Sequence, residues 1–446
     1  MVLRHLLRQG IGNSLIQIAA TTMVRLGLVL SLLVLAPLVA LEETGQFDLF
    51  IVGATFVQLA MTVGMDSGLA IVNQRRTLQM RRWYLIVSLT ILSALALLFY
   101  SVVELALLML TDLSGHAALI RIGLGYGTLM GAMILIFSWF RWQSRARTAS
   151  MLLVGANITS FAIAAVGFML FGTINAFVSG LFLGSAGGVC LCLYYLIRHD
   201  GFSLSDLRDI SDRKMLKPVA IDLLRLSLPY LFASISLILR RLVDRAYILT
   251  LGDPKLIGAY AIVTRASETI AFALSMPSVG FAPILVARHR EAPVQRLGRL
   301  MYTSYVIVAF LIVLAALFVS PQFFAATDDT AIAAIVPLAT SIIAGTLFLG
   351  ETSIAAFGYV LARKPALFTA LSVAYIAGYA ASIVVLSALG FGIAALGWSF
   401  VVTSLLFSTA AVTWSEKLAC FGYPLTAILA LKTATAFAAV WPLLSM

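Results

Sequence analysis

Thirteen apolar stretches follow one another from Asn13 to Leu444, with only short loops between them. A transmembrane helix needs about 20 apolar residues to cross a bilayer core that is about 30 Å thick. Of the 446 residues, 61% are hydrophobic and only 11% are charged, which is too few charges to cover a soluble protein of this size. The sequence therefore predicts an all-α polytopic membrane protein. Its predicted segments span residues 12–40, 47–73, 83–110, 118–140, 149–171, 174–197, 222–250, 256–287, 299–320, 331–361, 365–389, 391–415 and 424–444.

The longest loop, residues 198–221, divides the chain into two sets of six segments. We expect one six-helix lobe in residues 1–197, a second in residues 222–415 and an additional C-terminal helix in residues 416–446, which gives 12–13 transmembrane helices. Because six is even, both lobes enter the membrane in the same sense, and a pseudo-two-fold axis along the membrane normal relates them around a central cavity. The loop itself reads as an amphipathic interfacial helix or as a solvated connector.

A weak internal repeat supports the two lobes. A shift of 213 residues aligns residues 45–75 with residues 258–288 without a gap, and it places Gly45 on Gly258. The hydropathy of the two stretches also agrees. The repeat therefore favours two related halves.

The positive charge follows the membrane topology. The net charge is +11, and most of the 30 lysines and arginines lie in alternate loops, beginning with the N-terminus. The positive-inside rule places these loops and the N-terminus in the cytoplasm, so no nucleic-acid partner is expected. The side of the C-terminus depends on whether residues 424–444, which contain Lys432, cross the membrane. Three cysteines and four histidines show no ligand spacing, so no metal site is predicted.

Charged side chains occur deep inside several apolar segments. A charge at the bilayer centre costs at least ~2.5–3.5 kcal/mol on insertion scales, so such residues usually line a polar pathway. This pattern predicts a transporter. The interior charges are Arg25, Asp66, Arg240, Arg241, Asp244, Arg245, Arg265, Glu268 and Glu351.

Two spacings allow a structural alternative. Asp244 follows Arg240 by one helical turn, and Glu268 follows Arg265 by one turn. Each pair is either a neutralising strut between helices or part of the transport pathway. We assign Arg240 and Asp244 to a structural ion pair.

The remaining interior side chains are candidates for substrate binding and ion coupling. Arginine binds phosphate through a planar fork and keeps its charge, so Arg25, Arg241, Arg245 and Arg265 suit an anionic substrate. Tyr375 and Tyr379 share a polar helix face and are candidates for stacking on sugar rings. A buried carboxylate can carry a proton, so H⁺ or Na⁺ coupling is assigned to Asp66, Glu268 and Glu351. No cofactor or ATP motif is found.

The stretch RRLVDRAYILTLGDPKLIGAYAI, Arg240 to Ile262, resembles the polysaccharide-unit flippases of the multidrug/oligosaccharidyl-lipid/polysaccharide exporter (MOP) superfamily. EETGQFDLF, Glu42 to Phe50, echoes it in the first half. The resemblance implies two six-helix lobes and transfer of an undecaprenyl-pyrophosphate-linked oligosaccharide across the bacterial inner membrane, for O-antigen (lipopolysaccharide) or exopolysaccharide biosynthesis. In the related lipid II flippases, arginines lie on the first, second and eighth helices. Arg25 and Arg265 match two of these, but the second helix has Asp66 instead.

We therefore expect a flippase that works by alternating access, with the lipid-linked oligosaccharide, membrane lipids and the polysaccharide polymerase machinery as partners. The alternative is an ion-coupled multidrug exporter of the same superfamily, which nothing in the sequence excludes. A membrane glycosyltransferase or polymerase is less favoured, because the outer loops have only about ten residues and carry no paired carboxylates. The chain is thus expected not to be an enzyme.

Overall fold

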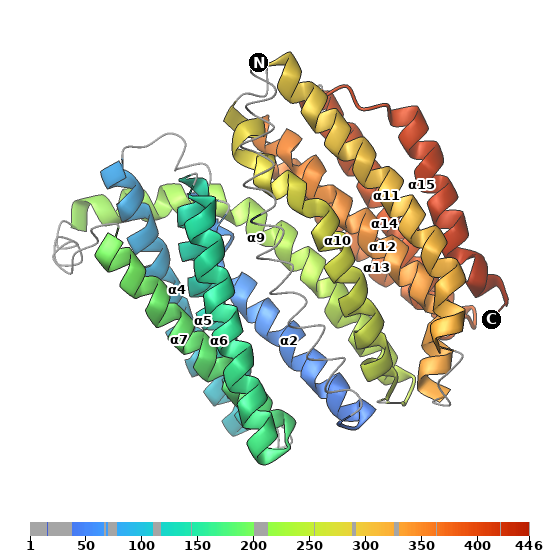
Figure 1. Ribbon diagram of the computed structural model, residues 1–446, viewed down its shortest axis with the longest axis horizontal. Helices are drawn as coiled ribbons and strands as arrows, with labels where there is room; N and C mark the ends of the chain where they lie inside the picture. Colours follow the sequence, from blue (N-terminus) through green and yellow to red (C-terminus); the bar gives the residue numbers. More distant parts are fainter. Residues whose placement is uncertain are drawn as a thin grey trace. The chain divides into compact units, whose positions relative to one another are not determined.

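The structure is a computed structural model in which long helices dominate (Figure 1). It describes residues 16, 38–66, 68–69, 78–109, 117–143, 145–199, 213–253, 255–287, 291–324, 330–362, 364–419 and 421–445. Within these ranges there is no β strand, and eleven helices are long and apolar enough to cross a membrane. The predicted all-α fold is therefore confirmed. Most of the first predicted segment, residues 12–40, lies outside the described residues, and so does Arg25.

The helix boundaries follow the hydropathy pattern closely. The described helices are α2 (Leu41–Thr62), α4 (Leu78–Met109), α5 (Ala117–Trp142), α6 (Ala146–Phe171), α7 (Ile174–His199), α9 (Arg213–Thr250), α10 (Lys255–Ala287), α11 (Ala292–Phe324), α12 (Thr330–Leu361), α13 (Pro365–Ala388), α14 (Ala394–Ala419) and α15 (Leu425–Val440), the last followed by the short 3₁₀ helix η3 (Trp441–Ser445).

The helices form two compact units, divided at Asp48 and at Leu239. One unit contains residues 49–238, where α6 packs on α7 and α5 contacts α4, α6 and α7. The other contains residues 1–48 and 239–446. The first turns of α2 thus belong with the second half of the sequence. The predicted lobes at 1–197 and 222–415 remain a prediction.

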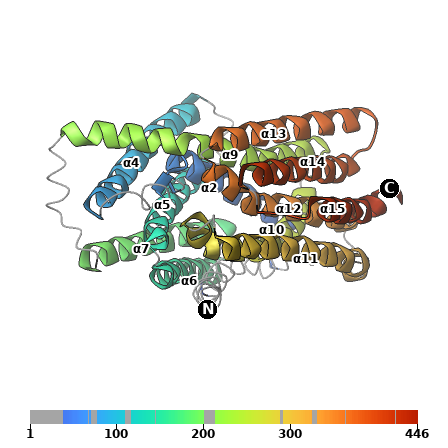
Figure 2. The same ribbon diagram turned by 90° about the horizontal axis from the view of Figure 1, so that it is seen from above.

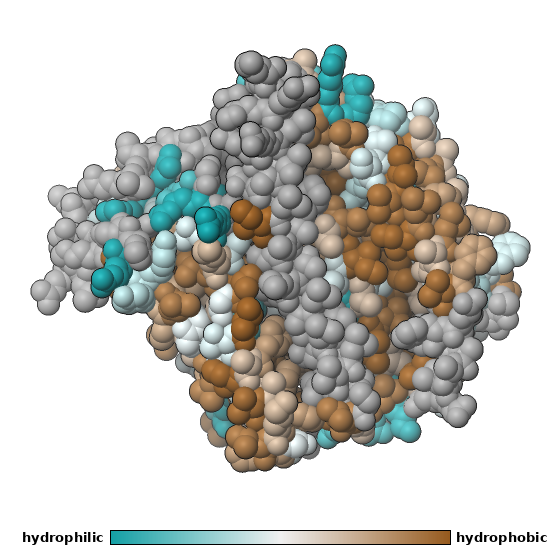
Figure 3. All heavy atoms as spheres, viewed as in Figure 1, coloured by the Kyte–Doolittle hydropathy of each residue, from teal (hydrophilic) through white to brown (hydrophobic). Residues whose placement is uncertain are grey.

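Helix α12 is the centre of the second-half unit. It packs against α10, α11, α14 and α15, and the view from above shows it among these helices (Figure 2). Leu338, Ile342 and Leu347 on α12 are almost completely buried. On α11, by contrast, Ile307, Leu311 and other large apolar side chains are exposed, and the space-filling view is largely hydrophobic there (Figure 3). An apolar outer face over a packed core is what a lipid-facing helix requires.

Helix α2 ends earlier than predicted. Val63 and Gly64 have positive φ angles of 49° and 68°, so the helix stops at Thr62. A Cβ atom on Gly64 would lie 2.6 Å from the carbonyl oxygen of Ser227, so only glycine fits this approach. The predicted segment 47–73 is therefore not one continuous helix, because the break separates Thr62 from Asp66.

Helix α9 begins earlier than the predicted segment at residues 222–250. Residues 213–221, which were placed in the connecting loop 198–221, form the first turns of α9. Pro218 and Pro229 lie inside this helix. The amphipathic pattern at residues 204–210 lies outside the described residues. At the other end of the chain, residues 425–444 form a candidate membrane span, which agrees with the predicted additional helix.

Candidate functional site

Asp48, on α2, is clamped between two arginines of the second half. Arg245 of α9 donates from Nε (2.9 Å) and Nη2 (2.7 Å) to Asp48 Oδ2. Arg265 of α10 donates from Nε (2.9 Å) and Nη2 (2.7 Å) to Asp48 Oδ1. Asp48 is completely buried and both arginines are at most 5% exposed. Two guanidinium groups therefore satisfy one carboxylate from both sides, which is the strong, charge-assisted form of hydrogen bond.

Asp244 is the second carboxylate of the same region. It accepts hydrogen bonds from Arg240 Nη1 at 2.7 Å, from the Tyr260 hydroxyl at 2.6 Å and from the Tyr379 hydroxyl at 2.5 Å. Arg245 Nη1 is 3.6 Å from its Oδ2 atom. Asp244 is thus held by side chains from its own helix α9, from α10 and from α13.

Glu268 is the third carboxylate. Its Oε1 atom is 2.9 Å from Arg241 Nε, and its Oε2 atom is 3.3 Å from Arg265 Nη1. We call the connected set the Asp48 cluster. It consists of Asp48, Arg240, Arg241, Asp244, Arg245, Tyr260, Arg265, Glu268 and Tyr379.

The local sequence explains how the cluster forms. Residues three and four apart lie on one face of a helix, so Arg241 and Arg245 project together from α9, and Arg265 and Glu268 project together from α10. Glycines allow α2 to reach them. A Cβ atom on Gly45 would be 3.3 Å from the Gly258 nitrogen, and one on Gly258 would be 2.2 Å from the Leu41 carbonyl oxygen. The two helix starts therefore cross in close contact.

Aromatic rings surround the cationic side of the cluster. The Arg240 guanidinium lies 4.1 Å from the centre of the Phe400 ring, and that of Arg245 lies 5.2 Å from the Tyr260 ring. The Tyr375 and Tyr379 rings stack at 6.2 Å. The contacts of Arg240 with Phe400 and of Arg245 with Tyr260 are cation–π contacts, which stabilise arginines that are buried away from water. The cluster can therefore keep four arginines and three carboxylates at membrane depth, and it ties α2, α9, α10 and α13 together.

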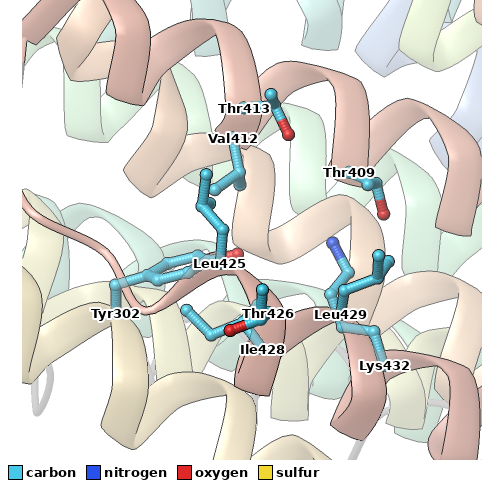
Figure 4. A pocket seen from close by; sticks show the side chains of 9 residues that line it. All are labelled: Tyr302, Thr409, Val412, Thr413, Leu425, Thr426, Ile428, Leu429 and Lys432. Atoms are coloured by element: carbon cyan, nitrogen blue, oxygen red, sulfur yellow. The ribbon is translucent and has the colours of Figure 1, made fainter.

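A second buried ion pair attaches α15. Lys432 Nζ is 3.1 Å from Glu351 Oε2, and both side chains are 2% exposed. The Tyr302 hydroxyl of α11 also donates to Glu351 Oε1. Lys432 lines a hollow of about 130 Å³ between α11, α14 and α15, together with Tyr302 and the hydroxyls of Thr409, Thr413 and Thr426 (Figure 4). We call the two residues Glu351 and Lys432 the Glu351–Lys432 pair.

The structure brings most of the predicted site residues together. Arg240, Arg241, Asp244, Arg245, Arg265 and Glu268 lie in the Asp48 cluster, Tyr379 joins it, and Tyr375 stacks on Tyr379. Glu351 lies in the separate pair with Lys432. Asp66 lies in the first-half unit, where it interacts electrostatically with Arg141. The assignment of these predicted site residues to substrate binding or ion coupling stays a prediction.

Sequence reasoning missed Asp48, Tyr260 and Tyr302. The second segment was predicted to begin at residue 47, which placed Asp48 at a helix end, where a charge is unremarkable. Helix α2 begins at Leu41, so Asp48 lies two turns inside it. Among the described residues, no group of histidine, cysteine and acidic side chains could hold a metal ion.

Comparison with solved structures identifies the fold. A mutant of the MATE transporter VcmN from Vibrio cholerae superposes with a TM-score of 0.66 at 14% identity, covering 93% of this chain and 97% of that chain. The fold is that of the MATE transporters. An outward-facing multidrug resistance MATE family transporter of the MOP superfamily gives 0.63 at 13% identity over 96% and 97% of the two chains. The eukaryotic MATE transporter AtDTX14 gives 0.68 at 11% identity over 98% and 99%.

The MATE-like fold, with its two lobes, agrees with the predicted architecture. These three structures are MATE transporters and not polysaccharide-unit flippases. No protein-family model and no curated protein matches the sequence. With eleven apolar helices and this fold, the chain is a multi-pass membrane protein.

Proposed function

We propose that this chain is a secondary transporter of the MOP superfamily that exports an amphipathic solute by alternating access. The observation that carries the proposal is the MATE-like fold, which spans more than nine tenths of this chain and of each compared transporter. Buried ion pairs at membrane depth add support, because they are costly in a protein without a polar pathway. The absence of a nucleotide-binding motif favours coupling to an H⁺ or Na⁺ gradient.

The comparisons favour an ion-coupled multidrug exporter over the flippase that the sequence resemblance implies. Arg245 and Arg265 each direct two N–H donors at Asp48, so they do not form a vacant pyrophosphate site in this structure. We therefore take the exporter of small amphipathic solutes as the first candidate.

Transfer of a lipid-linked oligosaccharide is the second candidate. It is supported by the flippase-like stretch from Arg240 to Ile262, which contains Arg240, Asp244, Arg245 and Tyr260 of the Asp48 cluster. Under this proposal the bacterial inner membrane is the location and the N-terminus is cytoplasmic. A polysaccharide polymerase would then be a partner.

Cells that lack the chain distinguish the two candidates. If it is a multidrug exporter, these cells become more sensitive to amphipathic dyes and drugs, cationic or anionic, while their surface polysaccharide is unchanged. If it is a flippase, undecaprenyl-pyrophosphate-linked oligosaccharide accumulates in the inner leaflet and surface polysaccharide is lost.

Complementing variants provide the controls. Arg265→Ala should fail to restore either phenotype at a normal protein level, because it removes half of the clamp on Asp48. Arg121→Ala, which changes an exposed ion pair with Glu104, should restore it fully. The transporter proposal is wrong if the deletion changes neither phenotype and the purified chain in proteoliposomes moves neither class of substrate under a pH or Na⁺ gradient.

A further inference from the structure

The clamp on Asp48 has the geometry of an oxoanion site. Each carboxylate oxygen accepts two hydrogen bonds from one guanidinium, through Nε and Nη2, at 2.7–2.9 Å. Two planar forks that face each other are suited to any group with two or more oxygens and a negative charge, such as a carboxylate or a phosphate. In this structure the oxoanion is a side chain of the protein itself.

The two arginines have other contacts in the second half of the chain. Arg245 donates from Nη1 to the Arg241 carbonyl oxygen at 3.3 Å, and its guanidinium packs against the Tyr260 ring. Arg265 contacts Glu268 one turn further along α10. These contacts come from α9 and α10 alone. The pair of forks is therefore positioned without the help of α2.

Asp48 reaches the forks from a distant part of the sequence. It is separated from Arg245 by 197 residues and from Arg265 by 217 residues. Helix α2 breaks at Val63–Gly64, so Asp48 lies on a helix of 22 residues with left-handed backbone at its far end. A movement of this short helix would withdraw the carboxylate and leave the forks in place.

We propose that Asp48 is a tethered counter-anion that occupies an oxoanion site for the transported substrate. A carboxylate or phosphate group of the substrate displaces Asp48 from Arg245 and Arg265, and this exchange frees the start of α2 from α9 and α10. The inference rests on the proposed transport function and names the substrate class as an amphipathic oxoanion. It also assigns the Gly45–Gly258 crossing to the contact that separates during the cycle.

Asp244 provides a matched control. It is also a buried aspartate in the same cluster, but Arg240 of its own helix and the hydroxyls of Tyr260 and Tyr379 hold it. Asp48→Asn and Asp244→Asn remove the same negative charge from the same region. Asp48→Asn removes the charge that accepts all four hydrogen bonds from the two forks, whereas Asp244→Asn changes only the 3.6 Å contact with Arg245 Nη1.

The experiment measures binding of inorganic pyrophosphate to the purified full-length chain by calorimetry. Asp48→Asn should bind it at least tenfold more tightly than the unmodified chain, because the one carboxylate that occupies both forks has lost its charge. Asp48→Asn combined with Arg265→Gln should lose this gain. Equal affinity of Asp48→Asn and the unmodified chain would overturn the proposal. So would an equal gain in Asp244→Asn, which would show a general effect of charge.

Two further ligands identify the source of the oxoanion. Farnesyl pyrophosphate represents a lipid-linked phosphate, and dodecanoate represents an amphipathic carboxylate. The affinity of each ligand for Asp48→Asn is compared with its affinity for the unmodified chain. The ligand whose affinity increases more has the headgroup of the substrate. If neither shows a gain, the forks do not serve an amphipathic oxoanion, and the proposal fails.

The unmodified chain provides a test that does not depend on a stable variant. Each of the three ligands is added in turn, and at least one of them should speed amide hydrogen exchange in residues 41–48, because these turns lose their hold on α9 and α10. Exchange in α15 should stay unchanged. Unchanged or slower exchange in residues 41–48 at saturating ligand would contradict displacement. Transport in proteoliposomes without this response would refute only the tethered anion, whereas the response without transport would refute only the proposed function.

Discussion

The Asp48 cluster and the Glu351–Lys432 pair are both buried ionic sites, yet they are built differently. Asp48 accepts four N–H bonds from two arginines, whereas Glu351 is held by one ammonium group and one phenol. Removing Asp48 leaves two arginines, which cannot give up their charge. Removing Lys432 leaves a carboxylate that can take a proton. The comparison predicts that loss of the acidic partner is more costly in the Asp48 cluster than loss of Lys432 is in the Glu351–Lys432 pair.

The largest effect is expected from Asp48→Ala. It leaves Arg245 and Arg265 buried without their shared partner, and breaking a buried ion pair costs about 3–5 kcal/mol. The free energy of unfolding, measured in mixed micelles, should fall by about this amount. A fall below about 1 kcal/mol would show that water reaches the arginines and that the clamp contributes little stability.

A smaller loss is expected from Lys432→Met, on the order of 2–3 kcal/mol, because Glu351 can become neutral and keeps its bond from Tyr302. The double variant Lys432→Met with Glu351→Met should recover most of this loss, since apolar side chains can replace a buried ion pair. Unfolding in mixed micelles again provides the measurement. If the double variant is no more stable than Lys432→Met, the two residues do not act as a pair.

Tyr379→Phe tests the redundancy within the Asp48 cluster. Asp244 keeps its bonds from Arg240 and Tyr260, so the loss should be about 1–2 kcal/mol, the value of one hydrogen bond to a charged group. Tyr302→Phe is the matching change at Glu351. Because Glu351 has fewer donors, Tyr302→Phe should destabilise the protein more than Tyr379→Phe. The opposite order would contradict the difference between the two sites.

The smallest effect is expected from Arg121→Ala. Arg121 and Glu104 form a bidentate pair at 2.6–2.7 Å, but their side chains are 51% and 42% exposed. Solvent screens such a pair, so neither the unfolding midpoint nor transport should change measurably. A marked loss would mean that exposed and buried pairs contribute alike.

The helices could be predicted from the sequence because hydropathy at membrane depth is a strong constraint. The segments from residue 83 onward match α4 to α15 within about ten residues at each end. The break at Val63–Gly64 could not be predicted, because it depends on the close approach of the Ser227 backbone, 163 positions further along the chain. The start of α9 was missed because its first turns are charged.

The site was predictable only in part. Helical periodicity identifies Arg240 with Asp244 and Arg265 with Glu268, since both partners lie on one helix. The partners from other helices, Asp48 for the arginines and Tyr302 for Glu351, depend on tertiary packing. Periodicity carries no information about which distant helix face a side chain meets.

The crossing of Gly45 and Gly258 has a consequence for the origin of the chain. The internal repeat makes these two glycines equivalent, and the structure places them against each other. In a symmetric dimer of two identical six-helix chains, a residue next to the two-fold axis meets its own copy. The contact is what such a dimer would retain after gene duplication and fusion. The repeat aligns Asp48 with Ala261, so the clamp on Asp48 has no counterpart in the other half of the repeat.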